Sequence, residues 1–441
     1  MSTRQKGFKA KQYGYHGYWA KDFTTLDEHL GDMKTFQKLI EKAHDRGIKI
    51  MLDVVVNHAG YGMDGEVWET WKADSENLPT EEELAEFGGM LRTVDEDPTV
   101  RGELDYLPDF KTEDPAVRQQ IIDWQTAWLE KAKTKRGDTI DFFRIDTVKH
   151  VEDATWQALK NDLTSIDPEF KMIGEYWGAS INNDGGYLGT GQMDSLLDFD
   201  FKEKAKSFVD GSIDSVETYL QDRNKQLSNT ATLGQFLSSH DQNGFLTEYV
   251  NGDVGKLKVA SSLQITSKGQ PVIYYGEELG RSGKSDWEKD TDGNVVAFGQ
   301  NRGDMPWELY ENKDPEAMAL HDHYSKLLNI RKDFSEVFSK GTREKVAGGD
   351  SDKYIVFSRE YNDDRLLVGL NTTSEKKEAT FKVDFAPKTK LTDLYSGKKY
   401  KVSKNQEITI ELPSKDQGGT AILAEFTPGK SNKKQKDHKK N

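Results

Sequence analysis

The order of apolar runs along the chain constrains the possible fold most strongly. Short strand-like runs alternate with amphipathic stretches of helical period over roughly the first three quarters of the sequence. In the stretch at about 32–46, one helical face carries Met33, Phe36, Leu39, Ile40 and Ala43, and Gly47 suits a helix C-terminus. This alternation predicts a parallel sheet whose strands are joined by crossover helices.

Six strand–helix units are expected in this region. The predicted strands are 48–56, a run ending at 146, 170–177, 195–201, 232–239 and 271–275. The predicted helices are 32–46, one beginning at Asp114-Pro115, 151–166, 202–226, 254–266 and one from Asp314-Pro315 towards 332. Because 48–56 is apolar on both faces, we expect it in the interior of the sheet.

The period changes at about residue 340. Alternating runs without helices follow, at 354–359, 366–370, 379–383, 407–412 and 421–426. This pattern predicts a separate antiparallel β-sandwich domain at 340–428, after a first domain at 1–339. The lysine-rich residues 429–441 are expected to be disordered.

Composition excludes several classes of function. The formal charge of -15 over 441 residues argues against nucleic acid as a partner. No apolar run approaches the roughly 20 residues of a membrane span, and residues 1–12 lack the apolar centre of a signal peptide. Without cysteine there are no disulfides, thiolate metal sites or cysteine nucleophiles. Oligomeric state is left open.

Acidic residues lie at or near the carboxyl ends of four predicted strands: Asp53, Asp146, Glu175 and Asp241. In a barrel of parallel strands these ends converge on one mouth. Arg144 lies two positions before Asp146, so both side chains point to the same face of a strand, and the guanidinium would keep Asp146 ionised. An inert network of salt bridges is the alternative interpretation.

Three convergent acids suit the retaining hydrolysis of a glycoside. That reaction needs an ionised nucleophile and a protonated acid roughly 5 Å apart. Asp146 suits the nucleophile. Glu175 lies in the less polar stretch 173–177, where desolvation and nearby aspartates would raise its pKa. Asp241 could stabilise positive charge that develops on the sugar ring.

Four segments carry a resemblance to a known family: 53–58 (DVVVNH), 143–150 (FRIDTVKH), 174–177 (GEYW) and 239–241 (SHD). In order and spacing they resemble the motifs of the α-amylase family of glycoside hydrolases. Residues 107–110 and 15–19 resemble two further short motifs of that family.

The resemblance implies an α/β fold, a (β/α)8 TIM barrel with an inserted loop domain at about 58–112 and a C-terminal antiparallel β-sandwich. Members of the family begin with a strand, a helix and a second strand before the segment that resembles 15–19. Only about a dozen polar residues precede it here. The barrel is therefore expected to be N-terminally incomplete, with exposed strand edges.

The resemblance also implies a role for each site residue. Asp146 would be the nucleophile, Glu175 the acid/base and Asp241 the stabiliser of the transition state. The residues expected to bind substrate are His16, Tyr18, Trp19, Asp53, His58, Arg144, Lys149 and His240. For Trp19, packing in the core is the alternative.

The ending Lys149-His150 is typical of family members that cleave α-1,4 linkages in starch. A calcium ion is implied, with Asn57, Asp109 and the backbone carbonyl of His150 as ligands, and oxygen ligands of this kind suit Ca²⁺. A further acidic ligand is left open among 95–97.

We therefore expect retaining endo-hydrolysis of α-1,4 bonds in starch-like α-glucans, including maltodextrin. An inactive amylase-like chain and an α-glucan transglycosylase are the alternatives, and a metal-dependent barrel hydrolase is a weaker one. The resemblance suggests an extracellular protein, whereas the lack of an apparent export signal suggests a cytoplasmic one.

Overall fold

The computed structural model describes residues 14–65, 79–228, 232–286 and 299–425, together with 288, 289, 291 and 295–297. They divide into two compact units. Among these residues, the first unit covers those within 14–197, 232 and 288–297, and the second covers those within 198–228, 233–286 and 299–425. The predictions for residues 1–12 and 429–441 lie outside the described residues. The predicted domain boundaries stay predictions.

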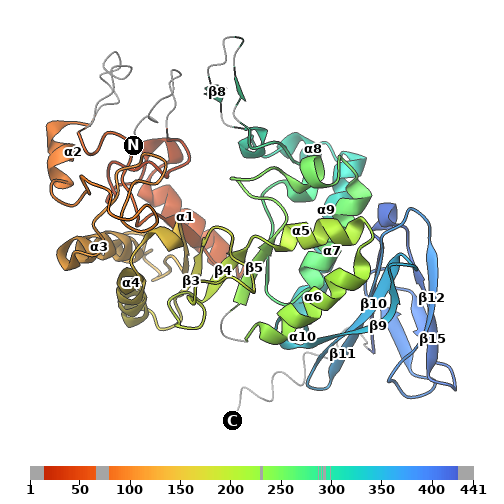
Figure 1. The fold of residues 1–441 in the computed structure, drawn as a ribbon. Helices are drawn as coiled ribbons and strands as arrows, with labels where there is room; N and C mark the ends of the chain where they lie inside the picture. The colour runs from red at the N-terminus through yellow and green to blue at the C-terminus, as the bar shows by residue number, and fades with distance from the viewer. Residues whose placement is uncertain are drawn as a thin grey trace. The chain divides into compact units, whose positions relative to one another are not determined.

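A parallel sheet positions the acids of the first unit. Its strands are β1 (Met51–Val54), β2 (Phe142–Ile145), β3 (Lys171–Gly174) and β4 (Ser195–Asp198), paired in sequence order. Its helices are α1 (Met33–His44), α2 (Glu81–Glu86), α3 (Pro115–Lys131) and α4 (Asp153–Ile166), and Figure 1 shows α3 beside α4. The predicted start of α3 is confirmed, since the Asp114 side chain accepts from the Ala116 amide.

The prediction that 48–56 forms an interior strand is wrong. β1 stands at the end of the strand order, and among the described residues its ladder partner is β2 alone. Ile48 is 55% exposed and Met51 is 48% exposed. An apolar run shows that a strand can be buried, but a neighbouring strand must be present to bury it. Within the described residues, β1 thus lies at an open edge of the sheet, as the resemblance implied.

The second unit contains the remaining parallel strands, β5 (Thr232–Phe236) and β6 (Gln270–Val272), which pair with each other. Its helices are α5 (Phe201–Val209), α6 (Ile213–Gln226), α7 (Val254–Thr266), α8 (Trp307–Glu311), α9 (Pro315–Asp333) and α10 (Ser335–Lys340). The short strands β7 (Glu288–Lys289) and β8 (Val295–Ala297) pair within the first unit.

The C-terminal part of the second unit is an antiparallel sandwich. One sheet has the order β14-β13-β16-β11-β10-β9 and the other pairs β12 with β15. Their bounds are β9 Thr342–Gly349, β10 Tyr354–Tyr361, β11 Asp364–Asn371, β12 Lys377–Lys382, β13 Lys390–Asp393, β14 Lys399–Lys401, β15 Glu407–Leu412 and β16 Thr420–Ala424.

The large sheet buries both faces. Val356, Leu367 and Phe381 belong to the core between the two sheets, whereas Phe357 and Leu366 face a core shared with α5, α6, α7, α9 and α10. Successive residues of β10 thus enter different cores, as the two-residue period of a strand requires. The predicted antiparallel domain is confirmed. No helix in the described ranges has both the length and the apolar character needed to cross a membrane.

Candidate active site

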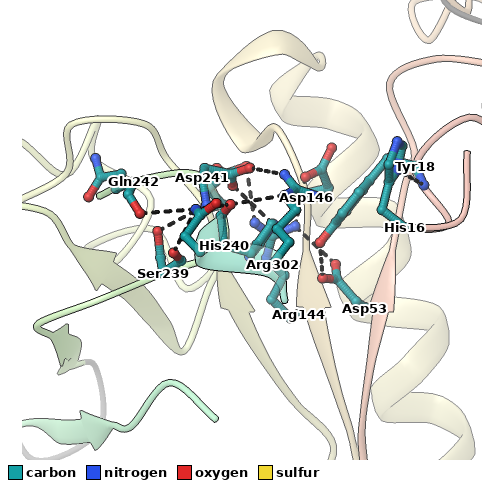
Figure 2. Close-up of polar contacts among 12 residues, drawn as sticks. His16, Tyr18, Asp53, Arg144, Asp146, Ser239, His240, Asp241, Gln242 and Arg302 are labelled. Atoms are coloured by element: carbon teal, nitrogen blue, oxygen red, sulfur yellow. Dashed lines mark hydrogen bonds and ion pairs between the residues drawn. The ribbon is translucent and has the colours of Figure 1, made fainter. Parts of the chain in front are cut away.

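Arg144 joins three carboxylates at the strand ends of the first unit. Its Nη1 lies 2.6 Å from Oδ1 of Asp146 and 3.0 Å from Oδ1 of Asp53, and its Nη2 lies 3.3 Å from Oε2 of Glu175. Figure 2 shows its contacts with Asp53 and Asp146. Burial alone would lower the pKa of Arg144, but the charges of Asp53 and Asp146 outweigh it and raise that pKa. The predicted pairing of Arg144 with Asp146 is confirmed.

Backbone hydrogen bonds fix where the two candidate catalytic acids leave the sheet. The Asp146 amide donates to the Val54 carbonyl at 3.0 Å, and the Glu175 amide donates to the Ile145 carbonyl at 2.8 Å. Each acid therefore extends the ladder one residue past its strand. Thr147 then turns into the left-handed region, with φ 51°, and its amide donates to Oε2 of Glu175 at 3.0 Å.

Aromatic residues at 16–18 cover the Asp53 side of this cluster. The Tyr18 hydroxyl donates to Oδ2 of Asp53 at 2.5 Å, and the Tyr18 ring stacks on His16 at a centroid distance of 5.6 Å (Figure 2). The Arg144 guanidinium lies 5.7 Å from the Tyr18 ring centroid. Burial, followed by the charge of Asp53, raises the pKa of Tyr18, so its hydroxyl stays a donor.

Two residues predicted to bind substrate are deeply buried. Trp19 is 6% exposed and packs with Tyr61 and Leu107, which favours the packing alternative. His58 is 2% exposed, its Nε2 lies 3.1 Å from the Tyr18 carbonyl, and burial lowers its pKa. His58 therefore supports the aromatic segment through a backbone contact.

A cavity of about 320 Å³ adjoins Glu175 within the first unit. Its lining consists of Leu104, Thr147, Lys149, His150, Glu175 and Trp177. Trp177 is 45% exposed. The structure thus brings the predicted residues Lys149 and Glu175 together, and the inserted segment contributes Leu104 to the same cavity.

The third predicted acid, Asp241, lies in the loop after β5 in the second unit. Its Oδ1 lies 2.7 Å from Nη2 of Arg302 and its Oδ2 lies 3.0 Å from Nε2 of His240 (Figure 2). Arg302 Nε and Asn301 Nδ2 both donate to the His240 carbonyl, at 3.0 and 2.7 Å. These contacts among His240, Asp241, Asn301 and Arg302 hold the Asp241 carboxylate in one orientation.

Comparison with known proteins assigns this arrangement to a family. The family model "Alpha amylase, catalytic domain" matches residues 7–340, and "Alpha-amylase C-terminal domain" matches residues 348–417. The chain belongs to the α-amylase family. The predicted fold class is confirmed with it, as a parallel-strand catalytic domain followed by a C-terminal antiparallel sheet.

Relatives of this α-amylase family member carry several names. Neopullulanase 2 of Thermoactinomyces vulgaris is 27% identical over 84% of the chain and 59% of its own length. Alpha-amylase 3 of Dictyoglomus thermophilum is 28% identical over 89% of the chain and 81% of its own length. The α-amylase of Geobacillus thermoleovorans, solved with acarbose, has the same fold, with TM-score 0.73, 24% identity and coverage of 95% of this chain and 86% of that one.

The chain spans about three fifths of the length of the first curated relatives: 59%, 63% and 59%. The comparisons therefore establish the family and its fold, and the activity of this member is a matter for proposal.

Sequence reasoning missed Glu277, which lies behind the Asp241 loop of this family member. Its Oε2 accepts from the Ser238 hydroxyl at 2.6 Å, its Oε1 accepts from the Tyr324 hydroxyl at 2.9 Å, and Ser238 Oγ accepts from the Phe245 amide at 3.0 Å. Burial raises the pKa of Glu277 to about 7. Its partners lie 39 and 47 positions away, so no local motif could reveal them.

The residues expected to hold calcium do not fit that ion as they are arranged. Asp109 is the only carboxylate among them, and its Oδ2 accepts from Nε of Arg92 at 2.7 Å. Burial raises the pKa of Asp109 to about 7 even beside this cation. Asn57 Oδ1 lacks a hydrogen-bond partner among the described residues, which suits a cation, but Ca²⁺ takes six to eight oxygen ligands.

No group of three His, Cys, Asp or Glu side chains within the described ranges is arranged to hold a metal ion. His150, expected to contribute its carbonyl, has its Nδ1 at 2.8 Å from the Thr99 carbonyl. The calcium prediction and the open choice among 95–97 stay untested predictions.

Proposed function

We propose that this chain hydrolyses α-1,4-glucosidic bonds in α-glucans by double displacement, with retention of anomeric configuration. One observation carries the proposal: Asp146 and Glu175 end adjacent parallel strands and share Arg144, at 2.6 and 3.3 Å, beside a cavity that contains Lys149 and Trp177. Two carboxyl groups held together at one cleft are what retaining hydrolysis requires.

In the first step Asp146 attacks the anomeric carbon of the sugar before the scissile bond. A bond forms from the carboxylate oxygen to that carbon, while the bond to the glycosidic oxygen breaks and the leaving oxygen takes a proton from Glu175. Arg144 orients Asp146 for this attack through its 2.6 Å contact. The released chain then departs through the cavity beside Lys149 and Trp177.

In the second step the ionised Glu175 removes a proton from water. The water oxygen attacks the anomeric carbon, the ester bond to Asp146 breaks, and the second inversion restores the original configuration. Asp241 is proposed to stabilise positive charge on the ring in both steps. Its role rests on its motif and on the local contacts with Arg302 and His240 that fix its carboxylate.

The sugar before the scissile bond is proposed to stack on the Tyr18 ring, which His16 supports from behind. His240 and Asp53 would orient its hydroxyls. No step of the proposed reaction uses a metal ion.

Two relatives favour testing substrates beyond starch. A neopullulanase and a cyclomaltodextrinase align with 84% and 90% of the chain. Cyclic and branched α-glucans therefore belong in the substrate panel, and so does transfer to a sugar acceptor in place of water. The relatives constrain the cellular location less, since a periplasmic α-amylase of Escherichia coli is also among them. An extracellular or cytoplasmic location stays a prediction.

The test is to incubate the purified chain with soluble starch, maltodextrin, cyclomaltodextrin and pullulan. We expect reducing ends from starch, and proton NMR should show the α-anomer as the first product. A first product in the β-configuration would contradict double displacement, and well-folded protein without activity on any of the four would contradict the enzyme itself. Products longer than the maltodextrin supplied would identify transfer to a sugar acceptor.

A further inference from the structure

A buried arginine lies at the junction where the inserted segment meets the end of β1. Arg92 Nε donates to Asp109 at 2.7 Å, and its Nη1 and Nη2 donate to the two carboxylate oxygens of Glu113 at 3.0 and 2.7 Å. Its side chain is 4% exposed and that of Asp109 is 1% exposed. All three guanidinium nitrogens are therefore used.

Backbone hydrogen bonds connect the chain segments that surround Arg92. The Phe110 amide donates to the Asn57 carbonyl at 3.0 Å, just beyond β1, and the Arg92 amide donates to the Asp109 carbonyl at 2.7 Å. Glu113 immediately precedes Asp114, the residue that caps α3. The Arg92 side chain thus links two parts of the inserted segment to the start of α3, and the Phe110 amide links that segment to the stretch that follows β1.

The charges around Arg92 match what a bound cation would have to neutralise. Asp109 is almost fully buried, and a buried carboxylate is strongly unfavourable unless a positive partner compensates it. Asp109 was expected to receive that compensation from calcium. Here the bidentate pairing with Glu113 and the contact with Asp109 give both acids a fixed partner from the chain itself.

We propose that Arg92 serves as the cation of this junction, so that the inserted segment keeps its place on the strand ends without a divalent metal ion. The proposal is independent of the proposed hydrolysis, because it concerns the stability of the full chain. A failure of the starch assay would leave it unaffected.

Thermal unfolding of the full wild-type chain gives the first test. We expect the same melting temperature in EDTA and in millimolar calcium chloride, and no heat of Ca²⁺ binding by calorimetry. A clear fall in melting temperature in EDTA, restored by calcium, would overturn the proposal.

Substitution of the cation gives the second test. Arg92→Met removes the charge and leaves Asp109 buried without a partner, so we expect the melting temperature to fall by about 5 °C or more. Arg101→Met is the matched control. Arg101 lies in the same segment, pairs with Glu152 at 2.7 Å and with Glu96 at 3.3 Å, but is 39% exposed. Its loss should change the melting temperature little, because exposed pairs contribute little.

Equal melting temperatures for Arg92→Met and wild type would contradict the proposal. If Arg92→Met does not fold, Arg92→Lys keeps the test open. Lysine retains the charge but cannot make the bidentate contact with Glu113. We therefore expect the Arg92→Lys variant to melt at or somewhat below the wild-type temperature, and calcium chloride to leave that temperature unchanged. A lysine variant that melts with the wild type would support the inference, because a positive charge at this position would then suffice, whereas a fall in the melting temperature of the lysine variant in EDTA would overturn it.

Discussion

Two buried arginines in the first unit each contact carboxylates from different segments, and we assign one to the candidate active site and the other to the stability of the fold. Arg144 lies among Asp53, Asp146 and Glu175, one cation among three acids, and Glu175 lines a cavity. Arg92 donates from all three guanidinium nitrogens to Asp109 and Glu113, and Glu96 lies 3.7 Å from its Nη1. The same chemical pair can therefore orient reactive groups or brace a fold, and the cavity beside the acids distinguishes the first case.

The largest effects are expected from an Asp→Asn substitution, made once beside Arg144 and once beside Arg92. Asp146→Asn keeps the shape but removes the nucleophile, so the rate of starch hydrolysis should fall about 10,000-fold or more. Its melting temperature should stay near that of the wild type, because Arg144 keeps Asp53 and Glu175 as partners. Initial rates and a thermal melt measure both.

Asp109→Asn is the matched substitution at the bracing cluster. It should destabilise the chain by about 1–3 kcal/mol through the weakened contact with Arg92, while starch hydrolysis per folded molecule changes little. Chemical denaturation measures the first effect. Should Asp109→Asn abolish hydrolysis in folded protein, or should Asp146→Asn retain it, the division between the two clusters would not hold.

A smaller effect on the rate is expected from Arg144→Lys. An ammonium group cannot contact Asp53, Asp146 and Glu175 from one planar fork, so the nucleophile should lose its orientation. We expect kcat to fall about 100-fold with a smaller change in KM. Steady-state kinetics on maltodextrin would show it, and an unchanged kcat would show that Asp146 needs only a positive charge nearby.

The smallest effect is expected at a third cluster, whose cation can be titrated. In α1, His44 Nδ1 lies 3.0 Å from Asp138 and Nε2 lies 2.8 Å from Asp141, and the hydrogen bond with Asp138 is the largest cause of its raised pKa. A raised histidine pKa stabilises the fold fully below the unfolded value, about 6.5, and this stability is lost as pH rises through the folded value.

The free energy of unfolding should therefore decrease slightly from pH 6 towards pH 8 in the wild type, and less so in His44→Gln. Urea denaturation at a series of pH values measures it. Identical pH profiles for the two proteins would show that His44 carries no charge in the fold. Asp109, whose pKa burial raises to about 7, also titrates in this range in both proteins, so the difference between the two profiles is what reports on His44.

Local patterns predicted most of the elements. Asp114-Pro115 and Asp314-Pro315 begin α3 and α9, because a capping carboxylate followed by proline needs no distant partner. The pairing of Arg144 with Asp146 followed in the same way, from the two-residue period of a strand. The edge position of β1 did not follow from its apolar pattern, since it depends on whether another strand lies beside it. The expectation of an incomplete barrel came from the family resemblance.

Long-range contacts explain what was missed at the candidate site. Arg302 reaches Asp241 across 61 positions, and Glu277 reaches Ser238 across 39. Roles taken from the motifs at 146, 175 and 241 stay predictions until the variants are measured.

The sequence by itself determined which groups this protein has for chemistry: the acids at the strand ends, the arginine two positions before one of them, and the period that makes those strands parallel. Only the tertiary structure decided that Arg92 lies on Asp109, which the motif alone assigned to a metal ion. The reason is that a motif specifies local geometry, whereas the partner of a buried charge comes from wherever the fold brings a compensating charge within reach.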